Sequence, residues 1–233
     1  MHGFNPLALL AKPEYRALFV RGVEVTFIIA FFSWLLGMAV ALVLLVARLT
    51  PSRIAGALVA AYISYHRNVP TLVQLMLWYF GIASLLPGPL QQWVSDHNAE
   101  VIFSIIALGL CQAAYFSEDM RSGLRAVPPG QSQAARALGH GFGSTLRFVL
   151  LPQALRNSLP ALVSHTVSLF KNSSLAMAIG ATELTHAVTE VQSASFRTFE
   201  SFFIGAVLYL FFSLLLMGSG AMLDRQVRLA GAH

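Results

Sequence analysis

The sequence predicts an all-α integral membrane protein with five transmembrane helices. Hydrophobic residues make up 56% of the 233 residues and charged residues only 11%, whereas a soluble domain carries about 25% charged residues. The mean hydropathy is +0.67. The apolar residues gather in blocks about as long as the ~20 residues that a helix needs to cross a bilayer. These blocks occupy most of the chain, so we expect one transmembrane domain, residues 22–223, and no further globular domain.

The segment before the first block, residues 1–21, does not have the pattern of a cleavable signal peptide. It carries Pro6, Pro13 and Glu14, and it lacks a basic start, an apolar stretch and a small-residue cleavage site in that order. We therefore expect a periplasmic N-terminal segment, with the first span acting as its own insertion signal.

The first two predicted spans differ in their polar content. Residues 22–47 are apolar apart from Glu24, Thr26 and Ser33, and the block ends before several basic residues and Pro51. The second span, residues 55–82, contains side chains that are costly in hydrocarbon unless they face protein or water, namely His66, Arg67 and Asn68, together with Pro70. The middle of this span should face the bundle, with a kink at Pro70.

The remaining three spans follow a connecting segment that contains no lysine or arginine. Residues 84–100 hold two prolines and no Lys or Arg, which is typical of an outside loop. The third span covers residues 101–122, and its helix is expected to continue to Arg125, since nothing breaks it before Pro128. We place the fourth span at residues 155–180, with Pro160 as a second kink, and the fifth at residues 201–223, followed by a cytoplasmic tail, residues 224–233.

The distribution of basic residues predicts the orientation. Five spans place the two termini on opposite sides, and positively charged residues gather on the cytoplasmic side. One side collects Arg48, Arg53, Arg121, Arg125, Arg136, Arg147, Arg156, Arg225 and Arg228, and the other collects Lys12, Arg16, Arg21 and Arg197. The N-terminus is therefore expected in the periplasm, and the C-terminus and residues 123–154 in the cytoplasm. Because the basic residues are spread between apolar segments, the net charge of +5 does not predict a nucleic-acid partner.

The cytoplasmic segment contains two predicted helices joined at a glycine. Residues 133–138 are good helix formers, and Gly139 suits the left-handed position that ends a helix. Ser144 is expected to cap the next helix, residues 145–151. Small residues such as Ala134 and Ala135 let another backbone come close, so the first helix should fit a groove of a second protein.

This segment resembles a known motif. Gln133, Ala134 and Ala135, followed after three residues by Gly139 and after nine more by residues 149–152, resemble the EAA loop of ABC importer permeases. The leading Glu of that family is Gln133 here, and a glutamine can hydrogen-bond but cannot form an ion pair.

Other stretches resemble the polar amino-acid permeases within that family. Residues 67–70, 72–75 and 78–80 are similar to their second span, and residues 169–176 with 179–180 are similar to their fourth. Residues 68–70, 150–152, 200–202 and 227–229 are most similar to the glutamate/aspartate branch.

The resemblance implies a fold, a set of partners and an activity. The fold is that of a type I ABC importer permease (MetI-like) in the bacterial inner membrane. The partners are two ABC ATPase subunits, a second permease that is identical or a sister chain, and a periplasmic solute-binding protein. The chain itself is expected to bind no cofactor and to be no enzyme, with ATP and Mg²⁺ on the ATPase, because no Gly-x-x-x-x-Gly-Lys-Ser/Thr loop occurs. The residues expected to couple transport to the ATPase are Gln133, Ala134, Ala135, Leu138 and Gly139.

Polar residues within the spans are candidates for the translocation path. Ionisable groups at that depth usually face a cavity or one another. The polar candidates are Arg67, Asn68, Glu118, Asp119, Lys171, Asn172 and Ser173. Arg67 or Lys171 would suit the carboxylate of an anionic amino acid, and Asn172 and Ser173 its remaining polar groups. The alternative is an intramembrane salt bridge that fixes helix packing, for example of Arg67 with Glu118 or Asp119. A lone histidine such as His165 is more often hydrogen-bonded to a neighbouring helix than a proton relay.

Three other classes of membrane protein fit the sequence less well than an importer permease. An ion-coupled secondary transporter usually shows repeated halves, and none occurs here. A structural subunit of a membrane complex would not need Lys171 beside Asn172 and Ser173. An intramembrane enzyme would need a nucleophile, a base and metal ligands at workable spacing, and no such set is present.

Overall fold

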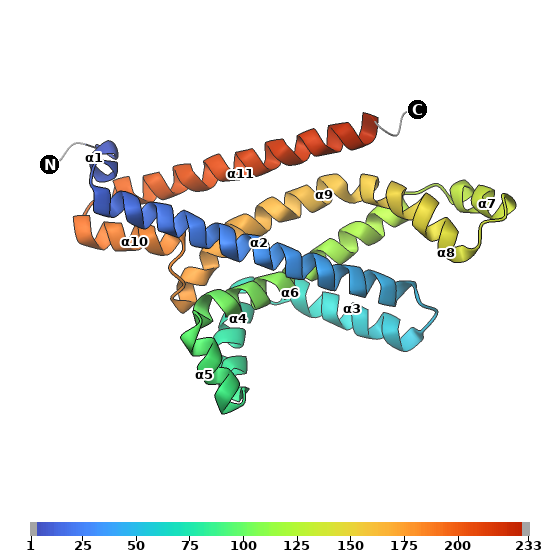
Figure 1. The fold of residues 1–233 in the computed structure, drawn as a ribbon, viewed down its shortest axis with the longest axis horizontal. Coiled ribbons are helices and arrows are strands. Elements are labelled where there is room, and N and C mark those ends of the chain that lie inside the picture. Colours follow the sequence, from blue (N-terminus) through green and yellow to red (C-terminus); the bar gives the residue numbers. More distant parts are fainter. Residues whose placement is uncertain (1–3, 230–233) are drawn as a thin grey trace.

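Long helices running side by side form the molecule (Figure 1). The computed structural model describes residues 4–229, without the side chains of 227–229, and this part is helical with no strand. Residues 230–233 of the tail, and the side chains of the 227–229 stretch that resembles the glutamate/aspartate branch, lie outside the described part.

The first long helix extends beyond the predicted first span at both ends. A short helix, α1 (Leu7–Leu10), precedes α2 (Pro13–Leu49), which contains residues 22–47. Pro13 stands in the first turn, where its missing N–H costs no hydrogen bond. At ~1.5 Å per residue, the 37 residues of α2 exceed the ~30 Å hydrocarbon core of a bilayer, so the helix projects beyond it.

The second predicted span is broken in its middle. Helix α3 (Arg53–Asn68) is followed by α4 (Thr71–Met76). A π-helical turn (Leu77–Gly81) and a 3₁₀ turn (Ile82–Leu85) come next. The direction changes by 107° between Arg53–Asn68 and Thr71–Leu85. The kink expected at Pro70 is therefore confirmed, because a proline cannot donate the hydrogen bond that would continue α3.

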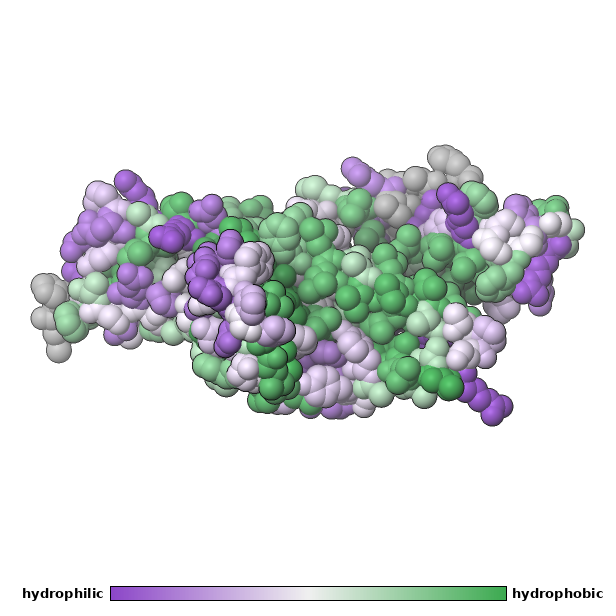
Figure 2. All heavy atoms as spheres, turned by 60° about the horizontal axis from the view of Figure 1, so that its bottom comes forward, coloured by the Kyte–Doolittle hydropathy of each residue, from purple (hydrophilic) through white to green (hydrophobic). Residues whose placement is uncertain are grey.

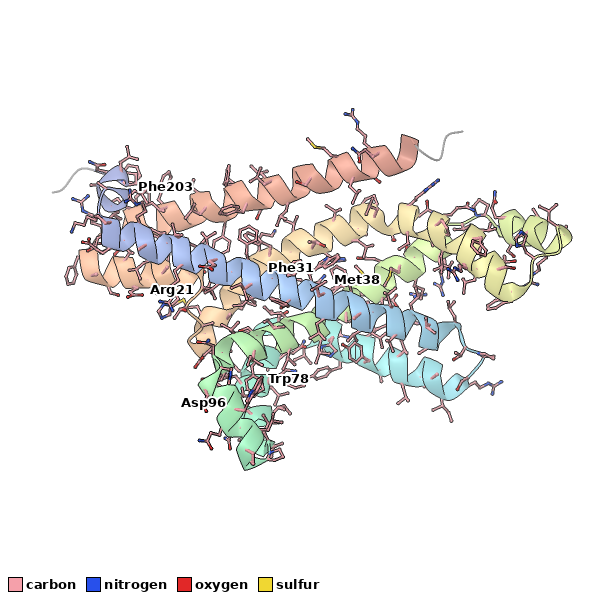
Figure 3. The ribbon with its side chains drawn as sticks, viewed as in Figure 1. Arg21, Phe31, Met38, Trp78, Asp96 and Phe203 are labelled. Atoms are coloured by element: carbon pink, nitrogen blue, oxygen red, sulfur yellow. The ribbon has the colours of Figure 1, made fainter. Side chains whose placement is uncertain are left out.

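The expected loop at residues 84–100 contains a helix, α5 (Gly88–Asp96). Its two prolines, Pro87 and Pro89, stand at the start of the helix, where they favour it instead of breaking it. The segment from α4 to α5 projects sideways from the bundle as an arm, which carries Trp78 and Asp96 (Figures 1 and 3).

The second half of the chain alternates long and short helices. Helix α6 (Ala99–Arg125) ends at Arg125, as predicted. It is followed by α7 (Pro129–Ala137) and by α8 (Phe142–Ser144), which continues into a π-helical turn (Thr145–Leu150). Helix α9 (Leu151–Asn172) comes next and ends in a 3₁₀ turn (Ser173–Ile179). Helices α10 (Leu184–Ser195) and α11 (Thr198–Leu229) complete the fold. The cap expected at Ser144 is wrong: the helix begins earlier, after Gly141, and the Ser144 hydroxyl donates to the Gly141 carbonyl.

Three helices of the described part are long and apolar enough to cross a membrane, α2, α6 and α11, and the bent α3–α4 pair makes a fourth if it is one span. The five-span count is compatible with this arrangement and stays a prediction, in which α9 is the remaining span. Helix α9 has 22 residues and is long enough. Its polar residues, among them Arg156, Asn157 and His165, lower its hydropathy.

Helix α6 is the centre of the bundle. It packs against α2 on one side and α9 on the other, and 56% of its most apolar stretch is buried, against 33% for α2 and 22% for α11. Gly123 lets α6 approach α9 closely, because a Cβ at that position would overlap the Ala154 carbonyl oxygen.

Helices α2 and α11 present large apolar side chains to the outside. Phe31 and Val43 on α2, and Leu210 and Leu214 on α11, are exposed. On the face shown in Figure 2, hydrophobic residues spread across the middle of the molecule and hydrophilic side chains gather mainly towards its two ends. Such an apolar zone between polar ends matches a bilayer as the surrounding solvent.

The termini of the long helices define two ends of the bundle. The end of α2 that follows α1 lies beside α10 and the start of α11, and we call this the α1 end (Figure 1). The opposite end carries α7, α8, the α2–α3 turn and the last turns of α11, and we call it the α7 end (Figure 1).

Candidate functional site

The segment singled out by the sequence projects from the α7 end of the bundle (Figure 1). Helix α7 ends at Ala137, and Gly139 takes a φ of +86°. The Gly139 N–H donates to the Arg136 carbonyl and the His140 N–H to the Ala135 carbonyl, both at 3.0 Å. This is the Schellman pattern of a helix that ends in a left-handed residue, so the expected role of Gly139 in ending the helix is confirmed.

The predicted coupling residues lie on different sides of α7. Gln133, Ala134, Leu138 and Gly139 are exposed, whereas Ala135 is buried. Ala135 therefore holds α7 in place, and the other four residues are accessible to a partner.

Three large apolar side chains at or just after the end of α7 are exposed. Leu138 is 82% exposed, and Phe142 and Phe148 on the following helical segment are each 65% exposed. We call these three residues the apolar docking surface. Exposed apolar groups in an otherwise polar region mark a site of protein contact, so the α7 end is suited to receive another protein.

A charged cluster ties the central helix to its two neighbours. Glu118 on α6 accepts a hydrogen bond from Arg48 Nη1 of α2 at 2.7 Å, and from Arg121 Nε at 3.0 Å. Asp119, the next residue, lies 2.6 Å from His165 Nδ1 of α9. The prediction that His165 is hydrogen-bonded to a neighbouring helix is confirmed.

The structure does not pair Arg67 with either acidic residue. Among the described residues Arg67 forms no ion pair, and its guanidinium lies 5.6 Å from the ring centre of Tyr115. Glu118 and Asp119 do make ion pairs between helices, but with Arg48 of α2 and His165 of α9. The choice of Arg67 as their partner is wrong, although its charge still acts on Glu118 from a distance.

Arg67 instead lines an open groove. Arg48 and Arg67 face a volume of about 300 Å³ whose other walls are Ala60, Ile63, Ser64 and Asn68. The Asn68 amide donates to the Ser64 carbonyl at 2.7 Å. The groove thus offers the guanidinium of Arg67 to an anion, while that of Arg48 is already paired with Glu118.

The candidates at the end of α9 are not equivalent. Lys171 is exposed and has no hydrogen bond or ion pair with the described residues, Asn172 is half-buried, and Ser173 is fully buried. The Ser173 hydroxyl donates to the Phe170 carbonyl at 2.7 Å and is satisfied within its own turn. Of the three, Lys171 is accessible to a ligand.

Two helix breaks meet near these residues. Asn68 ends α3 where the chain bends, Asn172 ends α9 where the 3₁₀ turn starts, and α4 packs against that turn. Leu75 and Ile179 share one apolar cluster at this contact. Broken helices expose backbone groups, and transporters use such breaks at their substrate sites.

Sequence reasoning missed a fully buried carboxylate, Glu183, near the α1 end. It is fully buried and accepts hydrogen bonds from the Thr185 and His186 N–H groups at 2.9 and 3.0 Å and from the Tyr209 hydroxyl at 2.7 Å. Thr26 of α2 lies beside it and accepts from the Leu184 N–H at 3.1 Å.

The sequence held partial signals for these contacts. The spacing of Glu118 and Arg121 by three residues predicts a pair on one helix face, but nothing local connects Arg48 or Tyr209 to their partners. Within residues 4–229 no group of three or more His, Cys, Asp or Glu side chains could hold a metal ion.

An apolar bundle, polar groups at two helix breaks and a protruding helical segment define a membrane transport subunit that works with other proteins. Residues 33–229 match the sequence profile of a family described as binding-protein-dependent transport system inner membrane component. The chain belongs to this family and is a multi-pass inner-membrane permease subunit. The expectation that it is not itself an enzyme is confirmed, since members of the family are permease subunits.

Curated relatives match over most of their length. The chain is 31% identical to the glutamate/aspartate import permease protein GltJ of Escherichia coli K12, covering 90% of this chain and 87% of the relative. It is 30% identical to the arginine transport system permease protein ArtQ of Bacillus subtilis 168, over 90% and 92%. It is 34% identical to the nopaline transport system permease protein NocM of Agrobacterium fabrum C58, over 82% and 80%.

Solved structures confirm the fold. The crystal structure of an amino acid ABC transporter with histidines matches with a TM-score of 0.84 at 28% identity, covering 97% of this chain and all of that one. An inward-facing MetNI methionine ABC transporter matches with a TM-score of 0.67 at 22% identity, over 93% and 99%. The resemblance to polar amino-acid ABC importer permeases and the MetI-like fold are therefore confirmed.

Proposed function

We propose that the chain is the permease subunit of an ATP-driven importer that moves polar amino acids from a periplasmic binding protein into the cytoplasm. The observation that carries the proposal is the protruding α7, which is held in place by Ala135 and Gly139 and bordered by the apolar docking surface. The family implies ATPase and binding-protein partners. We propose two ATPase subunits at the α7 end and a second permease, identical or a sister chain.

We propose that the α7 end faces the cytoplasm and the N-terminus the periplasm. Arg48, Arg121, Arg136, Arg147 and Arg225 belong to the α7 end, which agrees with the excess of basic residues on the cytoplasmic side of membrane proteins. In cells, a cysteine placed at exposed Arg136 should be protected from a membrane-impermeant maleimide, and one placed at exposed Lys12 should be labelled. The reverse labelling would overturn the orientation.

In this proposal α7 transmits the movement of the ATPases. Closure of the ATPase pair on ATP displaces a helix seated in its groove, and a rigid helix passes this displacement to α6 and α9. Gln133, Ala134, Leu138 and Gly139 form the contact. Gln133 contributes a neutral hydrogen bond where the family has a carboxylate.

Gly139 variants test this coupling. Gly139→Ala strains the positive φ but adds little bulk, and a Cβ at this position meets nothing within 4 Å. Gly139→Trp adds the same strain together with a large side chain at the contact. In proteoliposomes we expect Gly139→Ala to keep most ATP-driven uptake and Gly139→Trp to lose at least about tenfold in uptake per ATP hydrolysed. Full uptake by Gly139→Trp, or uptake without ATP, would contradict the mechanism.

We propose an anionic substrate, glutamate or aspartate. The similarity to GltJ supports it, as do Arg67 in its open groove and the accessible Lys171. ArtQ and NocM, named for arginine and nopaline, are similar to the same degree, so a direct competition is needed.

Uptake measurements with labelled amino acids decide the substrate. Proteoliposomes containing the complete transporter and its binding protein should accumulate labelled glutamate, with unlabelled aspartate competing and arginine not competing. Lys171→Met should lower glutamate uptake, whereas Lys12→Met, at an exposed lysine outside the proposed path, should not. If Lys171→Met leaves uptake and substrate choice unchanged, Lys171 does not contact the substrate. If arginine is accumulated instead, the anionic assignment is wrong.

A further inference from the structure

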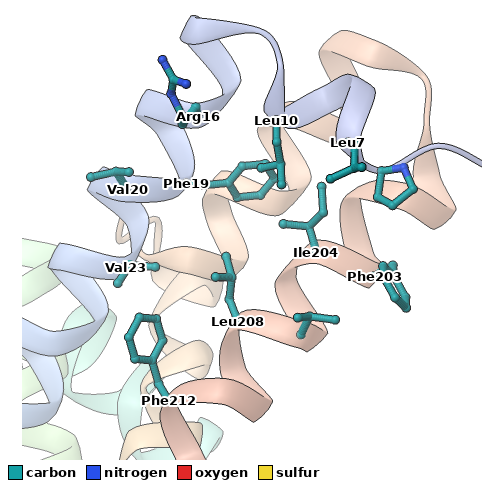
Figure 4. Close-up of a pocket in the computed structure, with 12 residues that line it drawn as sticks. Leu7, Leu10, Arg16, Phe19, Val20, Val23, Phe203, Ile204, Leu208 and Phe212 are labelled. Carbon is teal, nitrogen blue, oxygen red and sulfur yellow. The ribbon is translucent and has the colours of Figure 1, made fainter. Parts of the chain in front are cut away.

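An apolar groove opens between α1, α2 and α11 at the α1 end of the bundle (Figure 4). Its volume is about 480 Å³, and Arg16 is the one polar residue among those that line it. The walls include Leu7 and Leu10 of α1, Phe19 and Val23 of α2, and Ile204 and Leu208 of α11. Nothing in the proposed transport mechanism uses this groove.

The groove has a fixed wall at its outer end. Phe4, just before α1, contacts the rings of Phe199 and Phe203 on α11 at 5.3 Å between ring centres. Arg197 Nη1 donates to the Asn5 carbonyl at 3.4 Å. These contacts hold α1 over the first turns of α11, so the groove is built into the fold.

The lining of the groove suits a hydrocarbon chain. All of its lining residues except Arg16 are apolar, and the stretch of α11 along the groove, Ile204 to Phe212, is ~12 Å long at ~1.5 Å per residue. An acyl chain can lie along this length without burying an unpaired polar group. Water is disfavoured, because it would have almost no polar partners.

The charge at the rim of the groove indicates which headgroup a lipid bound in the groove would carry. Arg16 lies at the upper rim in Figure 4, and its side chain points away from the apolar walls. Arg16 forms no ion pair with the described residues, whereas Arg197 lies 3.9 Å from Glu200 and Lys12 lies over the Tyr15 ring. Glu14, the acidic residue nearest in sequence, is two positions away and so faces another side of α2.

We propose that this groove is a binding site for one anionic phospholipid, with an acyl chain between α2 and α11 and the phosphate at Arg16. An acyl chain is surrounded by hydrocarbon everywhere in the bilayer. The apolar walls of the groove therefore set only the position of the acyl chain, and Arg16 selects the headgroup. The site lies outside the helix breaks and α7, and the proposal does not depend on the substrate or on the orientation in the membrane.

Native mass spectrometry of the complete transporter tests the proposal. The transporter is purified with its partner subunits, exchanged into detergent with a mixture of phosphatidylglycerol and phosphatidylcholine, and the lipids retained per permease are counted. Arg16→Gln removes the rim charge, and its matched control is Arg21→Gln, an exposed arginine of α2 that does not line the groove. Val207→Trp fills the groove, and its control is Val43→Trp on the lipid face of α2.

The expected result is specific to the groove variants. Arg16→Gln should weaken phosphatidylglycerol retention about fivefold, as expected for one basic residue near an anionic headgroup, and Val207→Trp should abolish it. Arg21→Gln and Val43→Trp should match the wild type. Equal loss in Arg16→Gln and Arg21→Gln, or full retention in Val207→Trp, would overturn the proposal.

A second readout separates lipid from a protein occupant. A photoreactive benzoylphenylalanine placed at Val207 should cross-link to phospholipid. If it cross-links to the second permease instead, the groove is a permease interface and the lipid proposal is wrong.

Discussion

Two glutamates, Glu118 near the α7 end and Glu183 near the α1 end, are removed from solvent by different means. Glu118 is 18% exposed and is paired with two arginines, one from α2 and one from its own helix. Glu183 is fully buried and is held by neutral donors: two N–H groups at the start of α10 and the Tyr209 hydroxyl of α11. One carboxylate is stabilised by charge and the other by hydrogen bonds and the helix N-terminus.

The difference reflects what each end of the molecule has to do. Arginine pairs that remain partly exposed can be rearranged at modest cost, and Glu118 lies at the end where we propose that the ATPases act. Buried hydrogen bonds to an uncharged neighbourhood are costly to break. The Glu183 cluster joins α2, α10 and α11 and should stay rigid during transport.

The largest effect should come from removing the fully buried carboxylate. Glu183→Ala leaves the N–H groups of Thr185 and His186 and the Tyr209 hydroxyl without their acceptor, and we expect a loss of about 3–4 kcal/mol in unfolding free energy. The measurement is the apparent unfolding temperature in detergent, followed by tryptophan fluorescence. Glu190→Ala on the same helix, where the side chain is 51% exposed, should change little. Equal effects of the two variants would show that burial does not distinguish them.

The charged cluster should tolerate one loss but not two. Arg48→Met and Arg121→Met should each cost about 1 kcal/mol, because Glu118 keeps the other arginine. The double variant should cost about 3–4 kcal/mol in total, which is more than the sum of the single effects, because it leaves the carboxylate without an ionic partner. Arg53→Met, at an exposed arginine, is the control. Strict additivity of the two single effects would argue against a shared carboxylate.

Removing one neutral hydrogen-bond donor of Glu183 should lower the unfolding free energy less. Tyr209→Phe removes the hydroxyl that donates to Glu183 and lies 3.0 Å from Thr185 Oγ1, while the two N–H donors remain. We expect a loss of about 1 kcal/mol, measured in the same assay, and no effect from Tyr65→Phe, an exposed tyrosine. A loss as large as that of Glu183→Ala would mean that the hydroxyl is the main stabilising partner.

The smallest effect should be a pH dependence. Burial raises the pKa of the Glu183 carboxyl, although its hydrogen bonds with Thr185, Tyr209 and His186 lower it. A raised pKa in the folded protein contributes stability below the unfolded value of about 4.3, and this contribution is lost as the pH rises through the folded value. The unfolding temperature of the wild type relative to Glu183→Gln should therefore fall as the pH rises above about 4.3. If this difference in unfolding temperature instead rises with pH, the pKa of Glu183 is lowered, and not raised, in the folded protein.

Local sequence patterns predicted much of the fold. Helix α6 runs to Arg125 because nothing before Pro128 interrupts it, the chain bends at Pro70 because proline lacks an N–H, and α7 ends at Gly139 because glycine accepts a positive φ. Local patterns failed at residues 84–100, where prolines start α5, and at Ser144, whose helix begins at Phe142 after Gly141.

The polar contacts were less predictable than the helices. The pairing of Glu118 with Arg121 is local, but Arg48 reaches Glu118 from 70 residues away, and that contact removes the partner expected for Arg67. Likewise, nothing near Glu183 in the sequence indicates Tyr209 or Thr26 as neighbours.

The sequence by itself determined that this chain is a membrane permease with a short helix, α7, suited to contact a partner. The signals for this are hydropathy, proline, glycine and a motif of small residues, and each of them depends only on a few neighbouring residues or on one helix. Tertiary structure alone decided which charges meet, which polar side chains are buried, and that α1, α2 and α11 enclose an apolar groove. The physical reason is that side-chain pairing depends on the distances between helices, which packing sets and which a linear pattern does not encode.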